Sequence, residues 1–123
     1  WHQTGRIDPT FSFARVYEES GFDGLLFFDT QNLAPECYVS LAAAASQTKY
    51  IQLGTGVTNP MTRHAAVTAS AMASLQVVSE GRAYLGIGRG DSSLAHLGYS
   101  PSSVDTFEEY LRKLQLYLRG RAV

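Results

Sequence analysis

This sequence has little cysteine, little histidine and almost no net charge, and each of these features argues against a class of protein. Cys37 is the only cysteine among 123 residues, which excludes an internal disulfide and fits a reducing compartment. The formal net charge is -1 and the Lys and Arg residues are scattered, so we set nucleic acid aside as a partner. With 45% hydrophobic and 17% charged residues, the composition is that of an ordinary globular domain.

Long apolar runs and a secretion signal are also missing. No run approaches the roughly 20 apolar residues of a membrane helix, and the first residues lack the basic-then-apolar pattern of a signal peptide. We therefore expect a cytoplasmic protein with no membrane partner. Because the chain opens at Trp1 rather than methionine, we also expect a fragment of a longer protein.

The few histidines do not form a metal-binding pattern. His2 and His96 have no partner at metal-ligand spacing, and Cys37 is isolated, so we predict no metal site. His64 follows Arg63 at an expected helix start, where a surface role is the simpler interpretation. The sequence has no Gly-x-Ser-x-Gly motif or comparable nucleophile motif, which argues against covalent hydrolysis.

Apolar periodicity, glycine and proline predict alternating helices and strands. The segment from Gly24 to Asp29 is a continuous apolar run, which predicts a strand buried on both faces. The predicted elements are a helix from Asp8-Pro9 to Gly21, a strand over 24–29, a helix from Pro35 to Thr48, a strand from Ile51, a helix from His64 to Ser79, a strand from Arg82, and a last helix capped by Asp105 and Glu108 and ended by Gly120.

The spacing of the strands predicts a parallel sheet. Gly24, Ile51 and Arg82 are roughly thirty residues apart, as repeated βαβ units require. This spacing fits a (β/α)8 barrel and equally fits an open, flavodoxin-like sheet. In either fold, ligands bind at the carboxyl ends of the strands, where Asp29, residues 56–59 and residues 88–91 fall.

Two glycine-rich strand exits are the candidate walls of a binding site. In the first, Gly54 and Gly56 remove Cβ atoms where another group would approach the backbone closely. The second, from Gly86 to Asp91, does not have its third glycine at the offset that a dinucleotide fingerprint requires, and its glycines could equally serve a sharp turn. Asp29 is either a loop cap or a site residue. Asp91 could cap a short following turn, or it could be a partly buried carboxylate with a raised pKa that transfers protons.

Several stretches in the same order resemble the bacterial-luciferase-like superfamily, and within it the coenzyme F420-dependent oxidoreductases similar to methylenetetrahydromethanopterin reductase. They are Gly21-Phe22-Asp23, the strand end at Asp29, the run from Leu53 to Pro60 (LGTGVTNP), and the run from Ser79 to Asp91 (SEGRAYLGIGRGD). The resemblance implies a TIM barrel. Residues 1–123 would then be a single partial domain of about half the family's barrel, a length estimate that follows from about 250 residues per barrel.

The resemblance also implies a cofactor site and a reaction. A non-prolyl cis peptide at Gly56-Val57 would form a bulge behind the deazaflavin ring, flanked by Thr58 and Asn59. Asp29 and Thr30 would lie near the polar edge of the cofactor, Gly88 in the second glycine-rich exit would bind it, and Asp91 beside the ring would handle protons. The implied reaction transfers a hydride between reduced F420 and an organic substrate.

Two other functions fit the same residues. One is an FMN-dependent monooxygenase of the superfamily, and the other is a non-catalytic flavin-binding or dimerisation fragment. The resemblance implies a homodimer through the helices at about 35–48 and 64–79. Their Ala and Ser content independently suits close helix packing across a two-fold axis.

Overall fold

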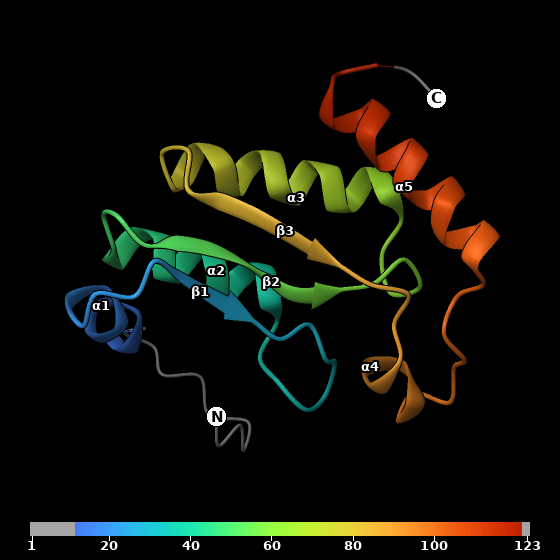
Figure 1. Cartoon of the computed structure of the whole chain (residues 1–123), viewed down its shortest axis with the longest axis horizontal. Coiled ribbons are helices and arrows are strands. Elements are labelled where there is room, and N and C mark those ends of the chain that lie inside the picture. The colour runs from blue at the N-terminus through green and yellow to red at the C-terminus, as the bar shows by residue number, and fades with distance from the viewer. Residues whose placement is uncertain (1–11, 122–123) are drawn as a thin grey trace.

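Parallel strands in the order β1-β2-β3 form the sheet at the centre of the molecule (Figure 1). The computed structural model describes residues 12–121. Its elements are α1 (Ser12–Glu19), β1 (Gly24–Phe27), α2 (Cys37–Gln47), β2 (Gln52–Thr58), α3 (Ala65–Val78), β3 (Ala83–Ile87), α4 (Ser92–Ala95) and α5 (Val104–Leu118). The predicted order of helices and strands is confirmed, and α4 is an addition to it. The predicted first helix start at Asp8-Pro9 lies outside the described residues.

The core lies between the helices and one face of the sheet. Because successive side chains of a strand point to opposite faces, Leu25 and Phe27 of β1 enter this core. The same cluster contains residues of α2, of α3, of β2 and of the segment just before β2: Cys37, Leu41, Ala44, Ala45, Ile51, Leu53, Met72 and Leu75. On α3, Thr68 meets the hydroxyl of Tyr110 from α5 at 2.6 Å, which joins the last helix to this layer.

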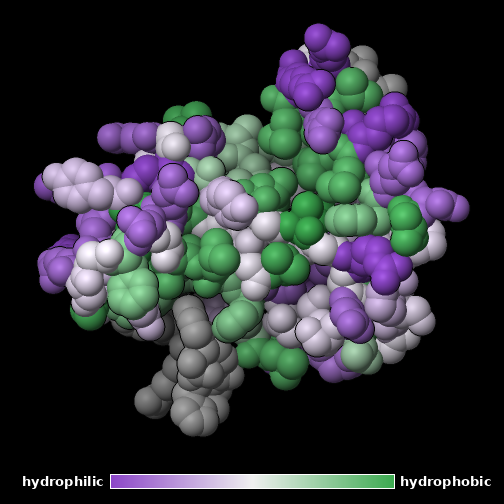
Figure 2. Space-filling view, in the orientation of Figure 1, coloured by the Kyte–Doolittle hydropathy of each residue, from purple (hydrophilic) through white to green (hydrophobic). Residues whose placement is uncertain are grey.

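The other face of the sheet carries exposed apolar side chains. Leu26 is 50% and Phe28 51% exposed, so the prediction that this strand is buried on both faces is wrong. The physical reason is that α2 and α3 pack on one face only. In Figure 2, hydrophobic side chains gather over the middle of the molecule, where Figure 1 shows the strands. We call this exposed side the inner face of the sheet.

Two predicted helix starts are wrong by a few residues. Pro35 is not the first residue of a helix, because α2 begins at Cys37 and the Glu36 carboxylate accepts a hydrogen bond from Val39 N at 2.8 Å. The acidic side chain completes the unsatisfied first turn and so fixes the start there.

The last helix also has a different cap. Ser103, rather than Asp105, caps α5, since its Oγ accepts a hydrogen bond from Thr106 N at 3.1 Å. A serine hydroxyl at this position reaches the third amide of the helix, which is the usual N-cap contact. The predicted end at Gly120 is confirmed: its φ of 67° is the left-handed conformation that glycine adopts without a Cβ clash.

A bulge interrupts the pairing of β2 with β3. Thr55 pairs with Leu85 and Thr58 with Ile87, so β2 has one more residue than β3 between these pairs. The extra length contains Gly56-Val57, whose peptide bond is cis, as the family resemblance implies. The Thr55 hydroxyl donates to Gly86 O at 2.6 Å and accepts from Gly86 N at 3.0 Å. A side chain thereby satisfies the backbone groups that the bulge leaves without ladder partners.

At the opposite end of the sheet, Glu18 fixes the entry to β2. Its carboxylate accepts hydrogen bonds from the backbone N–H groups of Lys49, Tyr50 and Ile51 at 2.9, 2.6 and 2.8 Å. Desolvation acts to raise the pKa of Glu18, but these hydrogen bonds outweigh it and hold the pKa below its usual value. The carboxylate thus ties α1 to the strand that begins at Gln52.

Replacing this carboxylate should give a pH-dependent loss of stability. A group whose folded pKa is lowered stabilises the protein above its unfolded pKa, and the contribution disappears as the pH falls through the folded value. Glu18→Gln should therefore lower the free energy of unfolding near neutral pH, and the difference from wild type should shrink in acid. Urea denaturation over this pH range measures it, with exposed Glu19→Gln as the control. An equal loss in acid and at neutral pH would contradict this role.

Candidate functional site

A cavity of about 470 Å³ opens at the carboxyl ends of the strands. It lies where parallel α/β sheets bind ligands, and its volume is in the range of small-molecule sites. The segments that follow β1 and β3 contribute to its wall, together with residues of β2 itself. The lining residues are Phe28, Asp29, Thr30, Gly56, Val57, Gly88, Arg89, Gly90, Asp91, Ser92, Ser93 and Pro101.

Most of the residues predicted for the site lie together in this cavity. Asp29 and Thr30 come from the exit of β1, Gly56 and Val57 from the bulge, and Gly88 and Asp91 from the exit of β3. Sequence reasoning placed residues 88–91 at the ligand-binding end without assigning a role to Arg89 or Gly90, and it missed Phe28, Ser92, Ser93 and Pro101 as lining residues. Arg89 lies inside the glycine-rich exit, so its position in that run was the available signal.

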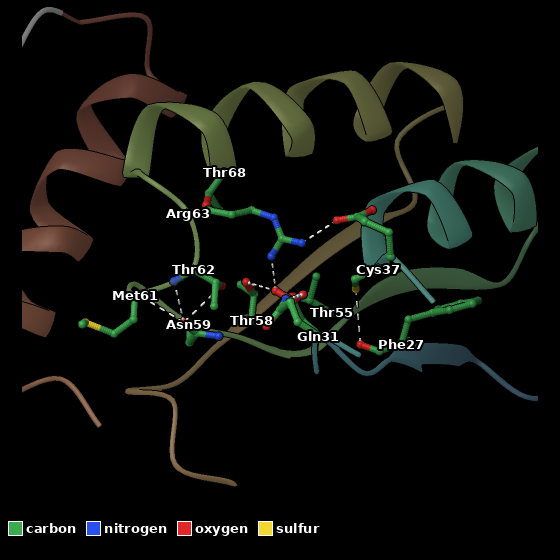
Figure 3. Close-up of polar contacts among 12 residues, drawn as sticks. Phe27, Gln31, Cys37, Thr55, Thr58, Asn59, Met61, Thr62, Arg63 and Thr68 are labelled. Carbon is green, nitrogen blue, oxygen red and sulfur yellow. Dashed lines mark hydrogen bonds and ion pairs between the residues drawn. The ribbon is translucent and has the colours of Figure 1, made fainter. Parts of the chain in front are cut away.

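Thr58 and Asn59 do not line the cavity. Both are fully buried, and each makes contacts within the protein. Thr58 donates to Asp29, while Asn59 Oδ1 accepts hydrogen bonds from the backbone N–H groups of Met61 and Thr62, each at 3.0 Å (Figure 3). Asn59 therefore shapes the turn after β2, as an Asx turn does. Its Nδ2 has no hydrogen-bond partner within residues 12–121.

Asp29 is a buried acceptor that other side chains surround. It is 2% exposed, and Oδ2 accepts from the Thr58 hydroxyl at 2.5 Å and from the guanidinium of Arg63. Its Oδ1 accepts from Gln31 Nε2 at 2.7 Å. A buried carboxylate needs such partners, because an unpaired charge away from water is very costly. Asp29 thus connects the exits of β1 and β2 while it lines the cavity.

Arg63 is the cation that sequence reasoning did not assign to the site. Its guanidinium pairs with both Asp29 and Glu36, and it stacks over the Tyr38 ring at 4.8 Å. In Figure 3, Arg63 extends from the turn after β2 toward the strand ends. Burial acts to lower the pKa of Arg63, but the carboxylates of Asp29 and Glu36 outweigh it and raise the pKa. The guanidinium therefore remains charged.

Asp91 lies at the outer edge of the cavity. It precedes α4, makes no side-chain capping bond, and is exposed. The prediction of a partly buried carboxylate is therefore wrong for this chain, because no described element covers that edge. Next to it, the Arg89 guanidinium is exposed and donates only a long hydrogen bond, 3.4 Å, to Ser102 O. The edge of the cavity thus presents one anion and one cation to a ligand.

One contact crosses from the exit of β3 to the exit of β1. His96, which ends α4, places Nε2 2.6 Å from the carbonyl oxygen of Gln31. This contact joins two segments of the cavity wall that are 65 residues apart in the sequence. The loops after β1 and β3 are therefore held together by this contact.

The described part of the chain contains no cluster of side chains that could ligate a metal ion. Residues 12–121 contain no group of three or more His, Cys, Asp or Glu side chains that could hold a metal ion. His64 caps α3, where its Nδ1 accepts from Ala66 N at 3.2 Å, in agreement with the predicted helix start. His2 lies outside these residues. Among the same residues, no helix is long and apolar enough to cross a membrane.

Comparison with known proteins assigns the chain to a family. The family model described as luciferase-like monooxygenase matches residues 1–123. The chain is 39% identical over 113 residues to a 5,10-methylenetetrahydromethanopterin reductase of Methanolobus tindarius, covering 90% of this chain and 34% of that protein. It is 32% identical over 117 residues to an F420-dependent hydroxymycolic acid dehydrogenase of Mycobacterium tuberculosis, covering 89% and 31%.

The structure agrees with the sequence comparison. It superposes on the coenzyme F420-dependent tetrahydromethanopterin reductase of Methanopyrus kandleri with a TM-score of 0.81 and 30% identity, covering 93% of this chain and 38% of that one. The match confirms the predicted α/β fold with parallel strands of a TIM barrel. The chain spans about a third of the length of the curated relatives it matches. On the match over its whole length, the chain belongs to the luciferase-like monooxygenase family.

Proposed function

We propose that the cavity binds the ring system of coenzyme F420 and that the protein is an oxidoreductase acting on a small organic substrate. The observation that carries this proposal is the cavity itself, which the Gly56-Val57 bulge and the glycine-rich exit of β3 line together. The similarity to F420-dependent relatives supports the choice of cofactor. We further propose that residues 1–123 form one partial barrel domain.

The lining residues suit a flat, partly polar ring. Gly88 adds no side-chain bulk beside Val57, so a ring can approach this part of the wall closely. Val57 and Phe28 are about half exposed and offer apolar surface for stacking. This combination of an apolar floor with a few polar groups at the edge is typical of cofactor sites.

The polar residues would hold the cofactor from its edges. Thr30 and Arg89 offer a hydroxyl and a cation at the rim, whereas Asp29, held by Arg63, forms part of the wall. Coenzyme F420, when bound, supplies a hydride carrier at C5 of its deazaflavin ring. The contribution of this chain is then to orient the ring and to exclude water from one side of it.

The second candidate is an FMN-dependent monooxygenase. The family is described as luciferase-like monooxygenase, and FMN has a similar flat ring that the same cavity could accept. A non-catalytic flavin-binding module is the third, since the chain spans only part of its relatives. Fluorescence titration with F420 and with FMN tests all three. We expect saturable binding with a preference for F420. A preference for FMN would favour the monooxygenase, and binding of neither would contradict a cofactor site in this chain.

We also propose that Asp91 moves a proton during the reaction. Its exposed carboxylate at the cavity edge can exchange protons with water. In the F420-loaded protein, Asp91→Asn should lower turnover about a hundredfold while leaving cofactor affinity nearly unchanged. Asp105→Asn in the first turn of α5 is the control, and steady-state kinetics with a parallel titration make the measurement. Full activity of the Asn variant would remove Asp91 from the mechanism.

We propose a homodimer through the outer surfaces of α2 and α3. A shallow depression on α3 is lined by Ala66, Val67, Ser70, Ala71 and Ser74. Val67 is 55% exposed, and small neighbours allow another helix to approach closely.

Sedimentation at micromolar concentration should show a dimer that Val67→Glu disrupts, because a buried unpaired charge opposes association. Val104→Glu on α5 replaces a valine that is 64% exposed, somewhat more than Val67, and should leave the dimer intact. A monomeric wild-type protein would contradict this interface.

A further inference from the structure

Val57 packs against two glycines, Gly86 within β3 and Gly88 just after it. Its side chain is 50% exposed on the inner face of the sheet. A Cβ built at Gly86 would lie 3.2 Å from Val57 Cγ1, and one built at Gly88 would lie 3.3 Å from Cγ2. Both distances are shorter than comfortable contact between carbon atoms. The missing side chains therefore leave the space in which the two Val57 methyl groups lie.

The two glycines differ in what the fold requires of them. A Cβ at Gly86 would also lie 2.3 Å from the carbonyl oxygen of Thr55, and one at Gly54 would lie 2.4 Å from that of Tyr84. Backbone cannot move away from such contacts without breaking the strand pairing. Among residues 12–121, and apart from its chain neighbours, a Cβ at Gly88 would have Val57 Cγ2 as its only atom within 4 Å, and the backbone there is not left-handed. Strand packing thus requires glycine at 54 and 86, but not at 88.

We propose that Gly88 is a positioning residue that acts through Val57. Without a Cβ at residue 88, the Val57 side chain lies low against β3, so that a flat ring can approach the bulge. A methyl group at residue 88 would push the Val57 side chain into the cavity. This inference rests on the proposed cofactor site but goes beyond it, because it gives Gly88 a role that needs no direct contact with the cofactor.

A double-mutant cycle separates this role from direct contact. Gly88→Ala should weaken F420 binding about tenfold, because the displaced valine occupies part of the ring site. In a Val57→Ala background the same change should have little effect, since the new Cβ then has no neighbour to displace. If Gly88 instead touches the cofactor directly, the tenfold loss persists in that background, and the inference is wrong.

A control variant guards against general effects of added bulk. Gly24 is also a strand residue, and within the described part of the chain a Cβ there would meet only Gln52 atoms at 3.6 and 3.8 Å, which is ordinary contact. Gly24→Ala should leave binding and thermal stability as in wild type. Gly88→Ala should also have the same thermal unfolding midpoint as the wild-type protein. A large loss of stability in Gly88→Ala alone would show that the fold does require glycine at this position.

A measurement on the free protein keeps the inference separate from the proposed function. Methyl NMR of Val57 reports its χ1 rotamer through three-bond couplings, with no cofactor present. We expect Gly88→Ala to change the Val57 rotamer populations and Gly24→Ala to leave them unchanged. Unchanged populations in Gly88→Ala would overturn the inference. Absence of cofactor binding together with a changed rotamer would reject the proposed function and leave the role of Gly88 standing.

Discussion

Between Thr55 and Thr58, strand β2 has one more residue than its partner, and the Thr55 hydroxyl supplies both hydrogen bonds that Gly86 needs there. Because these side-chain hydrogen bonds replace the missing backbone pairing, the sheet stays paired on either side of the bulge. It also places Val57 on the inner face, beside the glycines of β3. The shape of the cavity floor follows from this arrangement, because the same residues form both the irregular pairing and the lining.

A second set of polar contacts fixes the loops around that floor. Arg63 from the turn after β2 pairs with Asp29 after β1 and with Glu36 at the start of α2. Asp29 is buried and would be unfavourable without a partner, whereas Glu36 is exposed; the two ion pairs together hold the β1–α2 loop against the turn after β2. His96 adds a contact from α4 to Gln31. The strands therefore provide the platform, and charged side chains that are distant in sequence set the loop geometry.

The sequence was sufficient for features that depend on local chemistry and regular spacing. Strand spacing predicted the parallel sheet, and the strand ends predicted where Asp29, Gly56 and Asp91 would meet. Features that depend on partners distant in sequence were not predictable. Leu26 is exposed because helices cover one face only, and the pairing of Arg63 with Asp29 becomes visible only when two loops are brought together. Alternation along a strand does not say which face is covered.

The central claim is that the flat ring of a cofactor lies against the bulge on the inner face. The most direct test is methyl NMR of the protein saturated with F420, which detects ring-current shifts and contacts between ring protons and valine methyl groups. The account predicts large shifts and contacts at Val57, with Val67 on the outer surface of α3 unaffected. Binding that leaves Val57 unchanged, or that shifts Val67 instead, would contradict it.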